Sequence, residues 1–187
     1  MQTSIVRNGV DVKRLKETIQ AVQAQPDLAN FRFRLSNEWI NGGHNQSVIK
    51  DFYGAVKEDK SRKEAFIYSN DEPDVLLGQD NGANPVEYVL HALAGCLTTS
   101  LVYHASARGY KIERVSSKFE GDLDLRGFLG IDSSVRNGYS EIRVEFDIEG
   151  DFTEEQKQEI LQYGPRFSPV FDIVTNPVQV KLNLKGA

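Results

Sequence analysis

Cysteine is almost absent from this chain, because Cys96 is the only one among its 187 residues. A single thiol cannot form an internal disulfide, so any redox or nucleophilic chemistry must use this sulfur alone or with an outside partner. The N-terminal residues also lack the apolar core of a signal peptide. A chain without disulfides suits a reducing compartment, and we therefore expect a cytoplasmic protein.

An excess of basic residues is also absent. The net charge is -5, with acidic and basic residues interspersed along the chain. Nucleic-acid phosphates need a clustered basic face, so we expect no nucleic-acid partner. The most apolar segment, residues 84–108, is interrupted by Glu87, His91 and His104. These polar residues favour a buried helix of a soluble protein over a membrane span, and we expect no membrane partner.

The periodicity of apolar residues predicts a mixed fold. The length and the 40% hydrophobic content suit a single domain, residues 1–187, with an N-terminal helical extension at about residues 10–25. The predicted helices are residues 10–24, 85–108, 154–162 and 168–175, and the predicted strands are residues 31–36, 47–53, 64–69, 111–126, 138–150 and 178–184. Strands bunched with few helices between them favour an α+β fold with sheet packed on helix.

The longest predicted helix has clear signals at both ends. Asn84 is a suitable N-cap, Pro85 takes the first helical position, and Glu87 stands three residues after the cap, as in a capping box. Gly109 is placed to end the helix. In the same way, the Gly164-Pro165 pair is expected to end the helix that opens after Thr153.

Three segments together resemble the OsmC/Ohr superfamily. They are NPVEYVLHALAGCLTTSLVYHASARG from residue 84, the Gly-Gly pair at 42–43, and FSPVFDIVTNPVQVKLNL near the C-terminus. The likeness covers roughly residues 30–184. It implies an α+β fold in which antiparallel-rich sheets pack on two long central helices of an intertwined homodimer. It also implies chemistry, because active members of the superfamily reduce organic or inorganic peroxides.

Within this resemblance, four catalytic positions can be compared, and three of them depart. Cys96 matches the cysteine that attacks the peroxide. Ser168 stands where the family has a resolving cysteine, and His44 stands where it has an arginine after the Gly-Gly pair. The family glutamate follows the helix-opening proline, where this chain has Val86 and then Glu87. The resemblance therefore implies Cys96 and His44 as the candidate catalytic residues.

The chemistry at these positions leaves two interpretations of His44 open. A thiolate reacts with a peroxide and a thiol barely does, so a peroxidatic cysteine needs a nearby positive charge or donor array. His44 supplies a charge only when it is protonated, which predicts weaker and pH-dependent activation; alternatively, it is a loop histidine that hydrogen-bonds backbone. Glu87 lies nine residues from Cys96, about 180° around a helix, which favours a structural cap.

Other residues give little support for a metal or cofactor. His91 and His104 flank Cys96 on the same predicted helix, but neither falls on the face of the sulfur. The cysteine and the three histidines show no standard zinc-ligand spacing. We therefore expect no metal and no cofactor. Cys96 can also be interpreted as a small buried hydrophobe, because free cysteine is among the most buried residue types.

Three functions are compatible with these residues. The first is a thiol-dependent hydroperoxide reductase in which Cys96 reduces a small-molecule hydroperoxide and an external thiol reductant resolves the product, since Ser168 cannot. The second is a non-peroxidase member of the fold, whose pocket at the dimer interface binds a small apolar or electrophilic molecule. The third is a purely structural dimer. A homodimer is expected in each case, because a helix that is apolar on most of its surface must be covered on every side.

Overall fold

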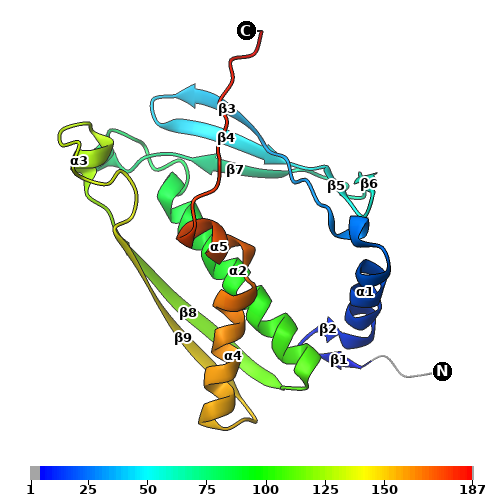
Figure 1. Ribbon diagram of the computed structural model, residues 1–187. Coiled ribbons are helices and arrows are strands. Elements are labelled where there is room, and N and C mark those ends of the chain that lie inside the picture. The colour runs from blue at the N-terminus through cyan, green and yellow to red at the C-terminus, as the bar shows by residue number, and fades with distance from the viewer. Residues whose placement is uncertain (1–4, 187) are drawn as a thin grey trace. The chain divides into compact units, whose positions relative to one another are not determined.

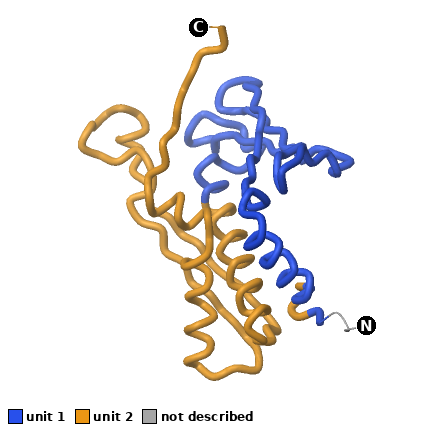
Figure 2. Tube along the Cα trace, turned by 45° about the vertical axis from the view of Figure 1, so that its right-hand side comes forward, with its two compact units in different colours: residues 1–6, 11–89 blue, residues 7–10, 90–187 orange. Residues whose placement is uncertain are grey.

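The computed structural model describes residues 5–186 and has the predicted mixed α+β architecture with antiparallel sheets (Figure 1). The chain forms two compact units, coloured separately in Figure 2. Unit 1 contains residues 5–6 and 11–89, and unit 2 contains residues 7–10 and 90–186. The first turn of the long central helix belongs to unit 1 and the rest of that helix to unit 2.

Five strands, β3 to β7, follow one another between the helices α1 and α2. The helices are α1 (Val12–Ala24), α2 (Pro85–Arg108), α3 (Leu125–Phe128), α4 (Glu154–Phe167) and α5 (Pro169–Thr175), with short 3-10 turns at Pro26–Ala29 and Asp74–Leu76. The strands are β1 (Val6–Arg7), β2 (Val10–Asp11), β3 (Ser36–Asn41), β4 (His44–Ile49), β5 (Phe52–Gly54), β6 (Lys57–Asp59), β7 (Phe66–Asn70), β8 (Ile112–Asp122) and β9 (Glu141–Gly150).

Unit 1 is built on an antiparallel sheet with the order β3-β4-β7. The turn between β3 and β4 follows Asn41, and Gly42 has φ of 49°, a left-handed conformation that glycine adopts at no steric cost. This turn places β3 at Ser36–Asn41, so the predicted strand at 31–36 is wrong. Alternation marked residues 31–35 as a strand, but in the structure they contribute only an isolated bridge between Arg32 and Tyr53.

Aromatic rings fill the space beside that bridge. The rings of Phe31, Phe33 and Phe52 lie 5.6–6.2 Å apart, centroid to centroid. Gly54 makes room for them, because a Cβ at this position would come within 2.3 Å of the Phe31 ring. The predicted strand at 47–53 is in fact two strands, β4 and β5, separated at residues 50–51, and β5 pairs with β6.

Unit 2 contains the main hydrophobic core. The predicted hairpin is confirmed, since β8 and β9 pair antiparallel from Ile112↔Gly150 to Asp122↔Glu141. Helices α2 and α4 lie along this hairpin (Figure 1). The core consists of buried residues from both helices and from β9: Leu101, Ala105, Ile148, Ile160 and Tyr163.

Helix α4 continues through the pair that was expected to end it. Pro165 lies inside the helix, which ends at Phe167 rather than at residue 162. Gly164 is buried against α2, where a Cβ would come within 3.3 Å of the Leu97 side chain. Packing against α2 therefore outweighs the local helix-breaking signal. The short helix predicted at 168–175 is confirmed as α5.

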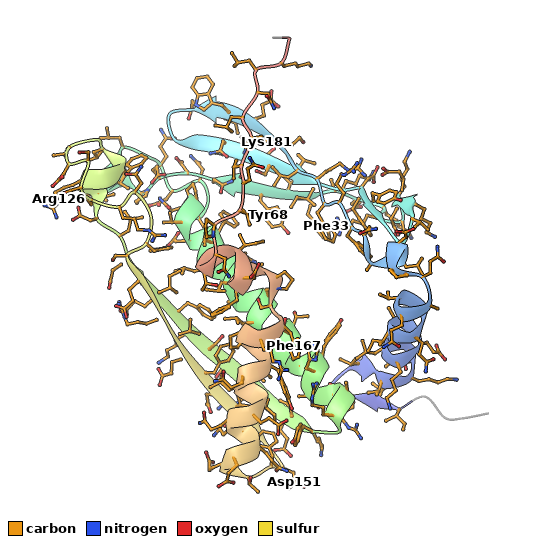
Figure 3. All side chains as sticks on the ribbon, viewed as in Figure 1. Phe33, Tyr68, Arg126, Asp151, Phe167 and Lys181 are labelled. Atoms are coloured by element: carbon orange, nitrogen blue, oxygen red, sulfur yellow. The ribbon has the colours of Figure 1, made fainter. Side chains whose placement is uncertain are left out.

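The predicted last strand, residues 178–184, is wrong for this chain. After α5 the segment has no assigned secondary structure and runs as an extended trace that carries Lys181 (Figure 3). Its alternating apolar side chains are exposed, with 74% for Val180 and 91% for Leu182. A strand requires a hydrogen-bonded partner, and the strands that the structure describes pair only among themselves.

The N-terminal helix is confirmed as α1, with Asp11 as its N-cap. A turn that precedes α1 binds the C-terminal end of α2. The Asn8 amide donates to the Ser106 hydroxyl (2.9 Å) and to the Tyr110 carbonyl (3.0 Å), and its oxygen accepts from the Ile112 N–H (2.9 Å). Asn8 therefore connects α2 to the start of β8.

Candidate functional site

The start of helix α2 is fixed by two reciprocal caps. The Asn84 side chain accepts a hydrogen bond from the Val86 N–H, and the Glu87 carboxylate accepts one from the Asn84 N–H, both at 2.9 Å. Tyr88, one residue later, donates its hydroxyl to the Ser69 carbonyl on β7 (2.9 Å). The Glu87 carboxylate has the structural capping role that its position predicted.

A buried carboxylate organises the loop that leads to this helix. Asp71 is 2% exposed and accepts hydrogen bonds from the backbone N–H groups of Glu72, Gln79 and Asn81 and from the Asn81 side chain. Burial raises the pKa of Asp71, but these donors together outweigh it and lower the pKa to about 2. Asp71 is therefore an anion that holds residues 79–81 in place. Glu72 in turn accepts a short hydrogen bond from the Asn84 amide.

His44 begins β4, directly after the turn at Gly42 and Gly43. Gly43 faces the acidic loop, because a Cβ there would lie 3.0 Å from the Glu72 side chain and 3.3 Å from an Asp71 carboxylate oxygen. The His44 side chain is half-buried, and its Nε2 is buried without a hydrogen-bond partner among residues 5–186. A buried polar atom without a partner is costly, and a catalytic role or a bound water or ion is one physical reason for such an atom.

Cys96 lies in the middle of α2 as a free, partly exposed thiol. The next residue, Leu97, is buried and contacts α4 at Gly164. Cys96 belongs to unit 2 and His44 to unit 1, and the pairing of the two side chains stays a prediction.

Ser168 is buried between α4 and α5 and has a structural role. Its hydroxyl accepts the Phe171 N–H at 3.1 Å as the N-cap of α5, and its own N–H donates to the Gly164 carbonyl at 3.0 Å. Ser168 is therefore the N-cap of α5, and Pro169 takes the first helical position. Ser168 has no redox chemistry of its own and cannot replace a resolving cysteine.

The sequence did not indicate the contacts of the two helical histidines. His91 is exposed, whereas the His104 ring stacks on Phe167 with 3.6 Å between centroids. Burial, Arg108 and Arg166 lower the pKa of His104, in that order of importance. Phe167 lies beyond residue 162, where the helix was expected to end, so the predicted elements carried no signal for this stack. Within residues 5–186, no group of three or more His, Cys, Asp or Glu side chains could hold a metal ion.

Comparisons with solved structures identify the fold. An OsmC-like protein from Mycoplasma pneumoniae matches with a TM-score of 0.60 at 14% identity, over 78% of this chain and 89% of that one. An OsmC-like protein of unknown function from Vibrio cholerae matches with 0.55 at 12% identity, over 75% and 92%. An organic hydroperoxide resistance protein OsmC from Legionella pneumophila matches with 0.53 at 14% identity, over 80% and 93%.

A search of curated proteins finds no match. The family described as OsmC-like protein matches residues 78–183, which is more than half of the 187 residues. The matched region contains Cys96, the capped helix α2, the β8–β9 hairpin and the α4–α5 junction. This chain belongs to the OsmC-like protein family.

Proposed function

We propose that the protein is a thiol-dependent hydroperoxide reductase that uses Cys96 as its only redox residue. The observation that carries the proposal is the unpartnered, buried Nε2 of His44 at the start of β4, evaluated within residues 5–186. An imidazole in this condition can stabilise a thiolate as a cation or accept its proton as a base. Family membership supports the same chemistry, since one similar fold belongs to an organic hydroperoxide resistance protein.

The reaction has two stages. The Cys96 thiolate attacks one peroxide oxygen, the O–O bond breaks, and the alcohol leaves after it takes up a proton. The sulfur is thereby oxidised to a sulfenic acid. An external thiol then forms a mixed disulfide with release of water, and a second thiol frees Cys96 as that reductant becomes a disulfide. External thiols are needed because Cys96 is the only cysteine, and a reducing cytoplasm would provide them.

We further propose that the active form is a homodimer. By length and composition alone, α2 could cross a membrane, a test that the core helices of soluble proteins also pass, yet only 17% of its most apolar window is buried within this chain. The exposed alternating side chains of residues 178–184 are likewise uncovered. Strands β3 and β7 each pair only with β4 among the described residues, so a second copy has free sheet edges to which this segment can add.

The test measures consumption of cumene hydroperoxide with dithiothreitol as the external thiol. Cys96→Ser should abolish turnover, and dimedone should label the sulfur of the wild type only after peroxide is added. His44→Ala should lower turnover by about tenfold or more, whereas His91→Ala, at an exposed histidine, should leave it unchanged.

Three results would count against the proposal. Equal peroxide consumption by wild type and Cys96→Ser would exclude Cys96 as the redox residue. Unchanged turnover in His44→Ala would show that the imidazole does not assist the reaction of Cys96. Inactivity of the wild type with several hydroperoxides would favour the alternative function, which is binding of a small apolar molecule without turnover. Glu87, one residue after the family glutamate position, and Ser168, at the position of the resolving cysteine, serve as helix caps, and this observation favours the alternative.

A further inference from the structure

His104 on α2 lies in a cluster that requires a neutral imidazole. Its ring stacks on Phe167 with an interplanar angle of 10°, and Figure 3 labels Phe167 at the end of α4, beside α2. The Arg108 guanidinium lies 3.2 Å from Nδ1 of His104. A guanidinium has donors but no acceptor, so Nδ1 can form this hydrogen bond only as an unprotonated acceptor.

The charges around His104 are mainly positive. Arg108 lies on its own helix, 4.4 Å above the Tyr163 ring, and Arg166 on α4 lies 5.3 Å from the centre of the Phe167 ring. The nearby carboxylate, Glu159, already accepts hydrogen bonds from the hydroxyls of Tyr163 and Tyr110. A positive charge on His104 would therefore face two arginines and no free carboxylate within this cluster.

The stack also holds a junction between two helices. Phe167 is the last residue of α4, and Ser168 begins the cap of α5. One turn earlier, Gly164 contacts Leu97, the residue next to Cys96. We propose that His104 is a pH-sensitive latch, which holds the α4–α5 junction on helix α2 at neutral pH and releases it when the imidazole is protonated.

Protonation acts in two ways at this position. It converts Nδ1 from an acceptor to a donor that points at the Arg108 guanidinium, and it adds a cation between Arg108 and Arg166. The pKa of His104 is lower in the folded protein than its ordinary value of 6.5. The stabilisation is thus complete above pH 6.5 and is lost as the pH falls toward the lowered pKa.

The experiment compares the full-length wild type with His104→Phe, which keeps an aromatic ring for stacking but cannot titrate. Thermal unfolding is followed from pH 7.5 to 5.0. Hydrogen–deuterium exchange of peptides that cover residues 161–176 is measured at pH 7.5 and at pH 5.0, and each rate is corrected for the pH dependence of intrinsic amide exchange. Acidification should lower the Tm of the wild type by about 3 °C more than that of His104→Phe. Protection of residues 161–176 should fall only in the wild type.

Two further variants keep the test decisive. His91→Phe changes an exposed histidine of the same helix and should retain the full acid response. His104→Gln also removes the titrating group, but with a side chain that has no aromatic ring. This variant takes the place of His104→Phe in the comparison if His104→Phe does not fold. Equal acid responses in the wild type and in the His104 variants would overturn the proposal, as would unchanged protection of residues 161–176 in the wild type.

Discussion

Replacement of Asn8 tests whether the N-terminal turn fixes the helix that carries Cys96. The Asn8 side chain makes three hydrogen bonds, to the Ser106 hydroxyl, the Tyr110 carbonyl and the Ile112 N–H. Ser106 is fully buried, and after the substitution its hydroxyl can still donate to the Val102 carbonyl (2.7 Å) or to the Arg7 carbonyl (3.2 Å). Asn8→Ala therefore removes three interactions between distant parts of unit 2.

The expected cost follows from these contacts. Each hydrogen bond has a net value of about 1 kcal/mol, so the three together contribute about 3 kcal/mol. Asn8 also has φ of 50°, a left-handed conformation that asparagine tolerates better than alanine, which adds about 1 kcal/mol. Asn8→Ala should lower the free energy of unfolding by about 4 kcal/mol, a large fraction of the stability of an ordinary domain.

Urea unfolding followed by circular dichroism measures this change. Asn30→Ala is the matched control, because within residues 5–186 the only side-chain hydrogen bond of Asn30 is an exposed contact with Asp27 at 3.5 Å. The free energy of unfolding of this control should stay within about 0.5 kcal/mol of the wild-type value. If Asn8→Ala lost less than about 1 kcal/mol, the turn would not stabilise the end of α2 and the reasoning would be refuted.

Three other predictions concern the α5 cap, the acidic loop and the dimer. Ser168→Ala should cost about 1 kcal/mol in urea unfolding and leave hydroperoxide turnover nearly unchanged, and loss of turnover with intact stability would contradict its structural role. Because the pKa of Asp71 falls from 3.8 to about 2 on folding, its contribution to the stability of the folded protein is present above pH 4 and is lost toward pH 2. Asp71→Asn should flatten the dependence of Tm on pH in this range, and an unchanged slope would count against the role of Asp71 as an anion. Leu182→Asp should increase the monomer fraction in size-exclusion chromatography with light scattering, and a wild type that is already monomeric at micromolar concentration would disprove the dimer.

Local signals predicted the parts of the fold that depend on neighbouring residues. Helix α2 was predicted from its apolar content and the Asn84 cap, and both of its ends agree with the structure. The β8–β9 hairpin was predicted from alternation, and its strands pair as expected. The prediction of a strand at 31–36 was wrong because it relied on the alternation of apolar residues and did not use the Asn41-Gly42 turn. This turn fixes the register of β3 with β4.

Interactions between distant residues could not be predicted from the sequence. Helix α4 continues past residue 162 because Gly164 packs on Leu97, 67 positions earlier in the chain. Asp71 gains its partners at residues 79–81 only when the loop folds. The segment 178–184 alternates like a strand, but the chain offers it no partner strand among the described residues. In each case the missing information was the identity of the neighbour in space.

The helix caps exclude two residues from a catalytic role at the candidate site. The carboxylate of Glu87 accepts a hydrogen bond from the Asn84 N–H, and the hydroxyl of Ser168 accepts one from the Phe171 N–H. Neither residue is free to replace the glutamate or the resolving cysteine implied by the family resemblance. A catalytic cycle on this chain must therefore depend on Cys96 and on whichever group stabilises its thiolate, and the unpartnered Nε2 makes His44 our candidate for that group.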